Sequence, residues 1–201
     1  MQELKKETGN IYRLKIPFEN LYTSVFLIIA GGKKILVDCG TVSKDVDTVI
    51  VPLLAEVGFT LTDIETLVLT HKHGDHAGGL VRIVELNPRI TVVNDIRVLA
   101  DKISTYPLAG HTDDSIGVLD ERSHTLISGD GLQGAGVDKY RCSLYNKNAY
   151  IETIEKIKND KRIESILFSH AYEPWNKDFI KGRKKILKCL SDCIKYAGGQ
   201  K

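Results

Sequence analysis

Three runs rich in β-branched, aromatic and other apolar residues occupy the start of the chain. They cover residues 11–16, 22–29 and 33–38. Each run has the length and composition of a strand. Gly31-Gly32 separates the last two runs and is typical of a tight β-hairpin turn. The chain is therefore expected to begin with β-structure.

The spacing of apolar residues then changes to a helical period over residues 43–57. Ser43 is the expected N-cap and Gly58 the expected end of this helix. Pro52 lies inside the run and predicts a kink or a break, because proline has no backbone N–H to donate.

Strands and helices continue to alternate up to about residue 100. We predict a strand at 66–70, a helix from about 76 to 85 that ends at Asn87-Pro88, and a strand at 90–93 followed by a short helical piece. Strands that alternate with helices along the sequence argue for a layered α/β fold.

The second half of the chain begins near Lys102 and is again mostly β. The expected elements are strands within 104–110, 114–120 and 124–130, a helix at 147–158, a strand at 163–169 and a final amphipathic helix at 177–196.

Composition adds few constraints on function. The chain has 201 residues, 27% charged and 42% hydrophobic, which suits one ordinary globular domain or two halves that share a core. A net charge of +2 does not by itself imply nucleic acid. The first ten residues lack the apolar core of a secretory signal, so we expect a cytoplasmic protein. The four cysteines, at positions 39, 142, 189 and 193, have no C-x-x-C spacing.

A cluster of histidines follows the strand predicted at 66–70. His71, His73, Asp75 and His76 fall within six residues, with Gly74 between them. Residues two apart on an extended segment project to the same side, so His71 and His73 can share one ion. Asp75 and His76 follow the turn at Gly74 and point elsewhere, which suggests a second ion. Imidazole and carboxylate are ligands suited to zinc, iron or manganese.

Other candidate ligands stand at the ends of predicted strands. His111 follows a glycine, Asp130 lies between two glycines, and His170 ends the strand at 163–169. Together with the first cluster they supply more donors than one tetrahedral zinc takes, so two ions are the simplest interpretation. Asp38 also ends a strand; it either caps the following turn or accepts a hydrogen bond from a metal-bound histidine.

These segments resemble the signature of the metallo-β-lactamase superfamily of binuclear hydrolases. The matching motifs are ILVDCG, THKHGDHAGG, AGHTDDSIG, SGD and FSH, and the resemblance spans about residues 11–196. It implies a four-layer αββα sandwich in a single domain, 1–201, built from two similar halves, about 1–101 and 102–201. The expected member is small and similar to glyoxalase II or to lactonases.

The resemblance also implies which residue holds which metal. His71, His73 and His111 would hold one ion, Asp75, His76 and His170 would hold the second, and Asp130 would bridge them. His124 matches no motif and is expected to be an ordinary surface residue.

The chemistry expected of such a site is hydrolysis. Two zinc ions are the expected cofactors, with iron or manganese as alternatives. Zinc lowers the pKa of a bound water to about 7. The hypothesis is a metal-bridging hydroxide that attacks an ester, thioester, lactone or related carbonyl, with Asp75 orienting the nucleophile and accepting its proton. Candidate substrate contacts are Tyr22, Tyr145, Tyr172 and Trp175.

Two departures from the family pattern bear on the substrate. Asp113-Asp114 stand where the family often has Pro-Gly, which adds negative charge near one ligand. The chain has no long C-terminal helical extension of the glyoxalase II type, which argues against a glutathione thioester.

The main alternative is a mononuclear iron oxidoreductase similar to the persulfide dioxygenases, in which His71, His111 and Asp130 would form a two-histidine, one-carboxylate triad. A phosphodiesterase or nuclease is a weaker alternative. We expect a small-molecule substrate and neither a membrane nor a nucleic-acid partner, and we leave a homodimer open.

Overall fold

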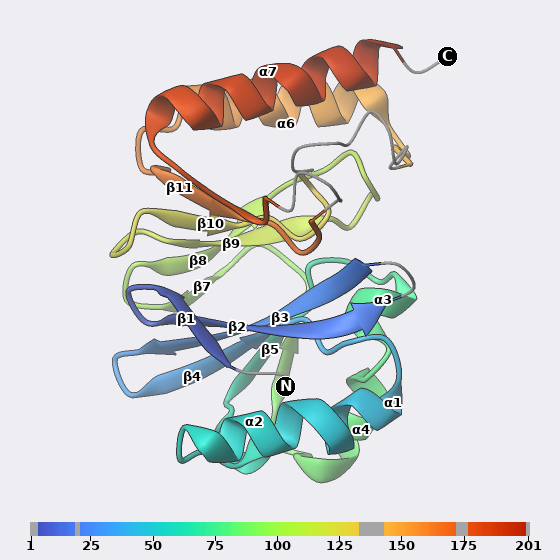
Figure 1. Cartoon of the computed structure of the whole chain (residues 1–201), viewed down its shortest axis with the longest axis vertical. Coiled ribbons are helices and arrows are strands. Elements are labelled where there is room, and N and C mark those ends of the chain that lie inside the picture. Colours follow the sequence, from blue (N-terminus) through green and yellow to red (C-terminus); the bar gives the residue numbers. More distant parts are fainter. Residues whose placement is uncertain (1–3, 19–20, 133–142, 172–176, 200–201) are drawn as a thin grey trace. The chain divides into compact units, whose positions relative to one another are not determined.

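The computed structural model describes residues 4–18, 21–132, 143–171 and 177–199, which form two compact units (Figure 1). The first unit runs to Asn94 and includes Leu99–Asp101. The second comprises Asp95–Val98 and the chain from Lys102 onward. Each unit is built on one six-stranded sheet. The assignment of residues 1–201 to a single domain stays a prediction.

The sheet of the first unit follows the order of the sequence. Its strands are β1 (Lys5–Thr8), β2 (Ile11–Phe18), β3 (Leu21–Ala30), β4 (Lys33–Val37), β5 (Thr66–Val68) and β6 (Thr91–Val93). Strands β1 to β4 are antiparallel, and β4, β5 and β6 are parallel. The hairpin at Gly31 and Gly32 is confirmed, since both residues have the positive φ that such a turn needs. Strand β1 is short and polar, so the hydrophobic pattern gave no sign of it.

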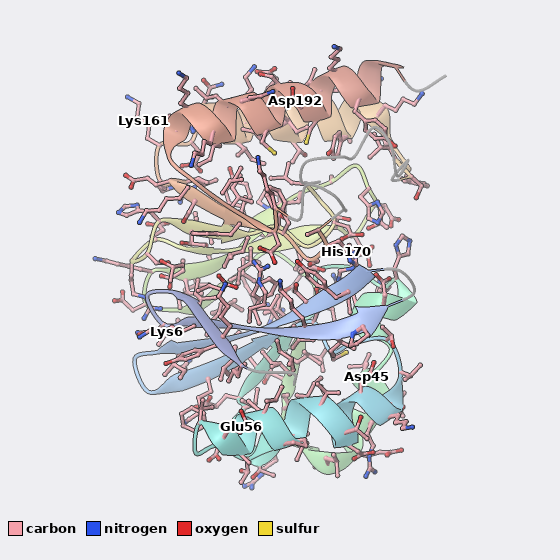
Figure 2. All side chains as sticks on the ribbon, viewed as in Figure 1. Lys6, Asp45, Glu56, Lys161, His170 and Asp192 are labelled. Atoms are coloured by element: carbon pink, nitrogen blue, oxygen red, sulfur yellow. The ribbon has the colours of Figure 1, made fainter. Side chains whose placement is uncertain are left out.

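The helix predicted at 43–57 is present but is built differently. It consists of α1 (Ser43–Asp45), a π-helical turn (Val46–Ile50) and α2 (Val51–Glu56). The N-cap is Val42 rather than Ser43. The carboxylate of Asp45, which Figure 2 labels, accepts hydrogen bonds from the N–H groups of Thr41 and Val42 at 2.8 and 3.1 Å. Pro52 does not break the helix, because it lies in the first turn of α2, where proline is tolerated.

The single helix expected at 76–85 is two short helices, α3 (Gly74–Ala77) and α4 (Leu80–Leu86). Gly78 and Gly79 separate them and pack directly against the backbone that follows β4. A Cβ on Gly78 would lie 1.9 Å from the Thr41 carbonyl oxygen, and one on Gly79 would lie 2.2 Å from that of Cys39. Only glycine permits this approach, and it is what interrupts the helix.

The second unit contains the remaining elements. They are β7 (Val98–Ala100), β8 (Ile103–Pro107), β9 (Ile116–Asp120), β10 (Thr125–Ile127), α6 (Lys147–Asn159), β11 (Ser165–Leu167), β12 (Phe179–Lys181) and α7 (Arg183–Gly199). The sheet order is β12-β11-β10-β9-β8-β7. Strand β10 pairs in parallel with β11, whereas β9 lies between β8 and β10 and is antiparallel to both.

Two predictions for the second unit were wrong in detail. The short helical piece expected after residue 93 is β7, because this segment pairs with β8 as an edge strand. The helix expected from residue 177 begins only at Arg183; the preceding residues form β12, which pairs with β11, and Gly182 with φ of 98° turns the chain into the helix.

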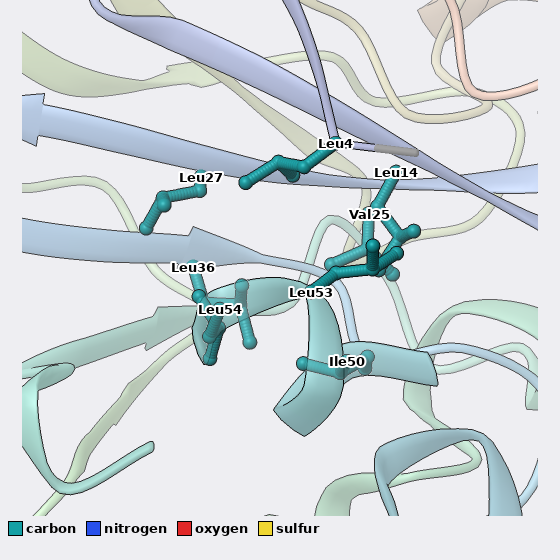
Figure 3. Close-up of a pocket in the computed structure, with 8 residues that line it drawn as sticks. All are labelled: Leu4, Leu14, Val25, Leu27, Leu36, Ile50, Leu53 and Leu54. Carbon is teal, nitrogen blue, oxygen red and sulfur yellow. The ribbon is translucent and has the colours of Figure 1, made fainter. Parts of the chain in front are cut away.

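Each unit has its own apolar core between a sheet and its helices. In the first unit α2 and its neighbours cover one face of the sheet, and the side chains around Leu36 and Leu53 enclose only a small apolar cavity (Figure 3). In the second unit α6 and α7 lie side by side on the sheet, over Leu119, Leu126 and Ile166 (Figure 1). Within the described part of the chain, every helix is too short or too polar to span a lipid bilayer.

Replacing Gly78 by alanine should destabilise the first unit. The new Cβ meets a backbone carbonyl that cannot rotate away, so we expect the free energy of unfolding to fall by about 1–3 kcal/mol in urea denaturation. The matched control is Gly74→Ala, because nothing lies within 4 Å of a Cβ at Gly74. Equal stability of the two variants would contradict the packing described here.

A buried carboxylate at the end of β9, paired with a partly exposed arginine, should make stability depend on pH. Asp120 accepts hydrogen bonds from the Arg122 backbone N–H, Nε and Nη2 at 3.0, 2.9 and 2.9 Å. Burial opposes the charged form, but these bonds outweigh it and hold the pKa of Asp120 below its ordinary value of 3.8. Asp120 therefore stabilises the fold above that value and loses this effect as the pH falls through its lowered pKa.

Asp120→Asn should accordingly reduce the free energy of unfolding by about 1.5–3 kcal/mol at pH 7. The difference from the unaltered protein should shrink as the pH falls below 3.8. Urea denaturation at pH 7 and pH 3 measures both. Asp192→Asn removes an exposed ion pair to Lys188 and serves as the control, because solvent-exposed ion pairs contribute little to stability. If Asp120→Asn lowered the free energy of unfolding by the same amount at both pH values, the proposed pH dependence through Asp120 would be contradicted.

Candidate functional site

The parallel pairing of β4 with β5 determines where the polar cluster of the first unit lies. Val37 pairs with Val68, so the chain leaves both strands at the same edge of the sheet. Asp38 follows β4 directly, and Thr70 and His71 follow β5. A carboxylate, a hydroxyl and an imidazole are thereby gathered at one edge, and all three side chains are buried.

The remaining donors of the first unit follow on one turn of the chain. His73 precedes α3 in extended conformation, and α3 then carries Asp75 and His76. The ring centroids of His71 and His73 are 4.6 Å apart, and those of His71 and His76 are 4.2 Å apart. The ligand atoms of His71 and His73 lie within 4.8 Å of each other, as do those of Asp75 and His76. The local cluster predicted from the sequence therefore forms two donor pairs.

Asp38 fixes the orientation of one of these imidazoles. It has φ of 63°, which is rare for a residue other than glycine. Its Oδ2 lies 2.7 Å from Nδ1 of His76 and accepts a hydrogen bond from the Thr70 hydroxyl at 2.9 Å; its Oδ1 accepts one from the Thr70 N–H at 2.8 Å. Because a carboxylate only accepts, Nδ1 of His76 carries the proton and Nε2 carries the lone pair.

The lone pair of His76 Nε2 faces a second carboxylate. Asp75 Oδ2 lies 3.2 Å from this nitrogen. Two acceptors at this distance repel unless a cation, either a proton or a metal ion, lies between them. An imidazole nitrogen opposed to a carboxylate, with the other ring nitrogen held by a buried aspartate, is the arrangement that metal-binding histidines adopt.

Cys39 lies beside this network but does not add a thiolate to it. Its Sγ donates to the His76 carbonyl oxygen at 3.2 Å. Burial and the nearby charge of Asp38 raise the pKa of the thiol to about 12. The neutral thiol packs as a small apolar group beneath the cluster.

A second pair of parallel strands organises the donors of the second unit. Ile127 of β10 pairs with Leu167 of β11, and Asp130 and His170 each lie three residues beyond these positions, at one edge of the sheet. Strand β8 runs in the same direction as β10, so His111 emerges at that edge too. Asp130 lies between the imidazoles, with Oδ1 at 3.2 Å from Nε2 of His170 and Oδ2 at 3.7 Å from Nε2 of His111.

His111 is oriented in the same way as His76. Its Nδ1 lies 2.8 Å from the carbonyl oxygen of Ser143, which can only accept, so Nδ1 carries the proton and the lone pair of Nε2 faces Asp130. Gly110 allows the chain to approach α6 at this point: it has φ of 136°, and a Cβ on it would lie 2.5 Å from the Tyr150 Cα. In the second unit, as in the first, the lone pair of a histidine Nε2 thus faces a carboxylate.

Both clusters suit a divalent metal ion. Imidazole nitrogens and carboxylate oxygens are the ligands of zinc and of iron or manganese sites. The hydrogen bonds on Nδ1 supply the orientation that such ligands need. The residues present therefore fit the metal that the sequence predicts, within each unit.

The predicted substrate contacts are only partly described. Tyr22 lies on β3, with Lys15 Nζ 4.2 Å from the centre of its ring. Tyr145 is 74% exposed, and its N–H donates to the His111 carbonyl oxygen. Tyr172 and Trp175 lie outside the described residues. The substrate roles of all four residues stay predictions.

Sequence reasoning missed two residues that hold the histidines. Thr70 stands at the head of the THKHGDH motif, and its place in that motif was a usable signal. Ser143 acts through its backbone carbonyl, which carries no sequence signal. His124 is exposed just before β10, with its Nδ1 3.1 Å from the Arg162 carbonyl oxygen.

Comparison with known proteins agrees with this architecture. Residues 19–100 match the family model described as the metallo-β-lactamase superfamily. The β-lactamase-like protein 2 homologue of Caenorhabditis elegans is 30% identical over 71% of this chain and 54% of its own length. The hydroxyacylglutathione hydrolase of Francisella philomiragia is 27% identical over 58% of this chain and 53% of its own length. The chain spans about half the length of these two relatives.

A solved structure shows the fold. The metallo-β-lactamase FIM-1 of Pseudomonas aeruginosa, in its mono-zinc form, matches with a TM-score of 0.76 at 14% identity, over 99% of this chain and 97% of that one. The predicted αββα sandwich of the metallo-β-lactamase type is confirmed. The chain belongs to the metallo-β-lactamase superfamily.

Proposed function

We propose that this chain is a metal-dependent hydrolase that cleaves an ester, thioester, lactone or related carbonyl compound. The observation that carries the proposal is the same in both units. In each unit, a histidine donates its Nδ1 proton to a protein oxygen, so that the lone pair on Nε2 faces a carboxylate. In the first unit His76 faces Asp75 in this way, and in the second unit His111 faces Asp130. A cation bound between the lone pair and the carboxylate would remove the repulsion in both pairs.

The ligand assignment follows the sequence resemblance. It gives His71, His73 and His111 to one ion and Asp75, His76 and His170 to the other, with Asp130 as the bridge. Zinc is the expected metal, and iron or manganese would suit the same ligands. The membership of the chain in a superfamily that includes a hydroxyacylglutathione hydrolase supports hydrolysis as the reaction class.

The side chains have distinct tasks in the proposed reaction. Asp38 and the Ser143 carbonyl hold imidazoles in the Nδ1–H form, so that they can ligate through Nε2. A bound divalent metal would supply an acidified water and would polarise the substrate carbonyl. The Asp75 carboxylate is only partly buried and can orient the nucleophile and accept a proton.

Chelation and ligand loss should both abolish hydrolysis. We expect a panel of ester, thioester, lactone and phosphodiester substrates to reveal an activity that a chelator removes and added zinc restores. His71→Ala should lower kcat/KM by more than the roughly 10–100-fold typical of losing a residue that only supports a ligand. His124→Ala is the matched control, because this exposed histidine belongs to neither cluster. Full activity in the metal-free protein would refute the proposal.

Metal content discriminates between the candidate reactions. Elemental analysis of the purified protein should give about two metal ions per chain, falling in His71→Ala and unchanged in His124→Ala. One iron per chain together with oxygen consumption would instead support the dioxygenase alternative. A phosphodiester as the only substrate cleaved would favour the nuclease alternative.

A further inference from the structure

We propose that Thr70 is a positioning residue that links Asp38 to His71, so that the single carboxylate of Asp38 orients one imidazole in each donor pair of the first unit. Asp38 holds His76 directly and His71 through the Thr70 hydroxyl. The orientation of the rings exists without a bound metal. Only the effect of this ring orientation on metal affinity rests on the proposed function.

The direction of each hydrogen bond follows from counting protons. Thr70 Oγ1 lies 2.9 Å from Asp38 Oδ2 and 3.2 Å from Nδ1 of His71. A hydroxyl has one proton, and a carboxylate can only accept, so this proton points to Asp38. The Thr70 oxygen then accepts from His71, which places the ring proton on Nδ1 and the lone pair on Nε2.

The opposite arrangement is unfavourable. If Thr70 donated to His71, its oxygen would face the Asp38 carboxylate as a second acceptor at 2.9 Å. All the partners are buried, with Asp38, Thr70 and His71 at most 1% exposed, so bulk water does not compensate such a repulsion. Asp38 therefore determines the tautomer of the His71 imidazole through the Thr70 hydroxyl.

The network branches at Asp38 Oδ2. The same oxygen accepts from Nδ1 of His76 at 2.7 Å, whereas Thr70 Oγ1 lies 3.5 Å from that nitrogen. His76 consequently depends on Asp38 directly, and His71 depends on Thr70. Because His71 pairs with His73 and His76 pairs with Asp75, one carboxylate serves a ligand in each donor pair.

Two substitutions separate these dependencies. Thr70→Val keeps the shape and the backbone N–H that donates to Asp38, and removes only the hydroxyl. Thr70→Ser restores the hydroxyl and is the conservative rescue. Thr153→Val removes a threonine hydroxyl that donates to the Ala109 carbonyl oxygen and is the matched control.

The first measurement is the tautomer of each histidine in the metal-free protein. Long-range ¹H–¹⁵N correlation spectra, assigned by replacing one histidine at a time, distinguish protonation at Nδ1 from protonation at Nε2. We expect His71 and His76 to be Nδ1–H in the unaltered protein, in Thr70→Ser and in Thr153→Val. In Thr70→Val, His71 should lose this preference while His76 keeps it.

The second measurement is stepwise zinc affinity by competition with a chromophoric chelator. Thr70→Val should weaken one binding step by about 10–100-fold and leave the other unchanged, whereas Asp38→Asn should weaken both. Circular dichroism confirms that each variant is folded. If Asp38→Asn fails to fold, the comparison of Thr70→Val with Thr70→Ser still tests whether the Thr70 hydroxyl positions His71.

The outcomes separate this proposal from the proposed function. An unchanged His71 tautomer in Thr70→Val would overturn the positioning role, as would a Thr70→Ser variant that behaves like Thr70→Val. The expected tautomers in a protein that binds no metal would support the positioning role and refute the metal-dependent hydrolase.

Discussion

One electrostatic constraint underlies the polar edge of each unit: a buried imidazole lone pair is turned toward a carboxylate. In the first unit His76 donates its Nδ1 proton to Asp38, and in the second unit His111 donates its Nδ1 proton to the Ser143 carbonyl oxygen. The opposite nitrogens then face Asp75 and Asp130 as acceptor against acceptor. Such a pair is stable only with a cation between its members, and a metal ion is the cation whose ligand preferences the residues match.

The backbone supplies this geometry through strand register rather than through the histidines themselves. Parallel pairing of β4 with β5, and of β10 with β11, brings distant segments out at the same edge of a sheet. Glycines then let the following loops pack closely, as Gly78 does against the Thr41 carbonyl and Gly110 against Tyr150. The positive φ of Asp38 is one local strain that this arrangement imposes, and its three hydrogen bonds offset it.

Much of this arrangement could be predicted from the sequence, because the informative signals were local. The alternation of strands and helices predicted the α/β class, the cluster around His71 predicted a metal site, and the motifs predicted the superfamily. The errors lay where tertiary contacts decide the local structure. Edge pairing made β7 and β12 strands where helix was expected, and the close approach of Gly78 and Gly79 split a helix that periodicity predicted as continuous. Ser143 contributes a backbone carbonyl, which has no side-chain signature for a sequence pattern to detect.

The most direct test of the central claim is anomalous X-ray diffraction at the zinc edge from crystals of the zinc-loaded protein. We predict anomalous density about 2.0–2.2 Å from Nε2 of His76 and a similar distance from the Asp75 carboxylate, with Nδ1 of His76 still bonded to Asp38. A zinc-loaded crystal without a peak at Nε2 of His76, or with zinc on Nδ1 and the Asp38 bond broken, would contradict the account.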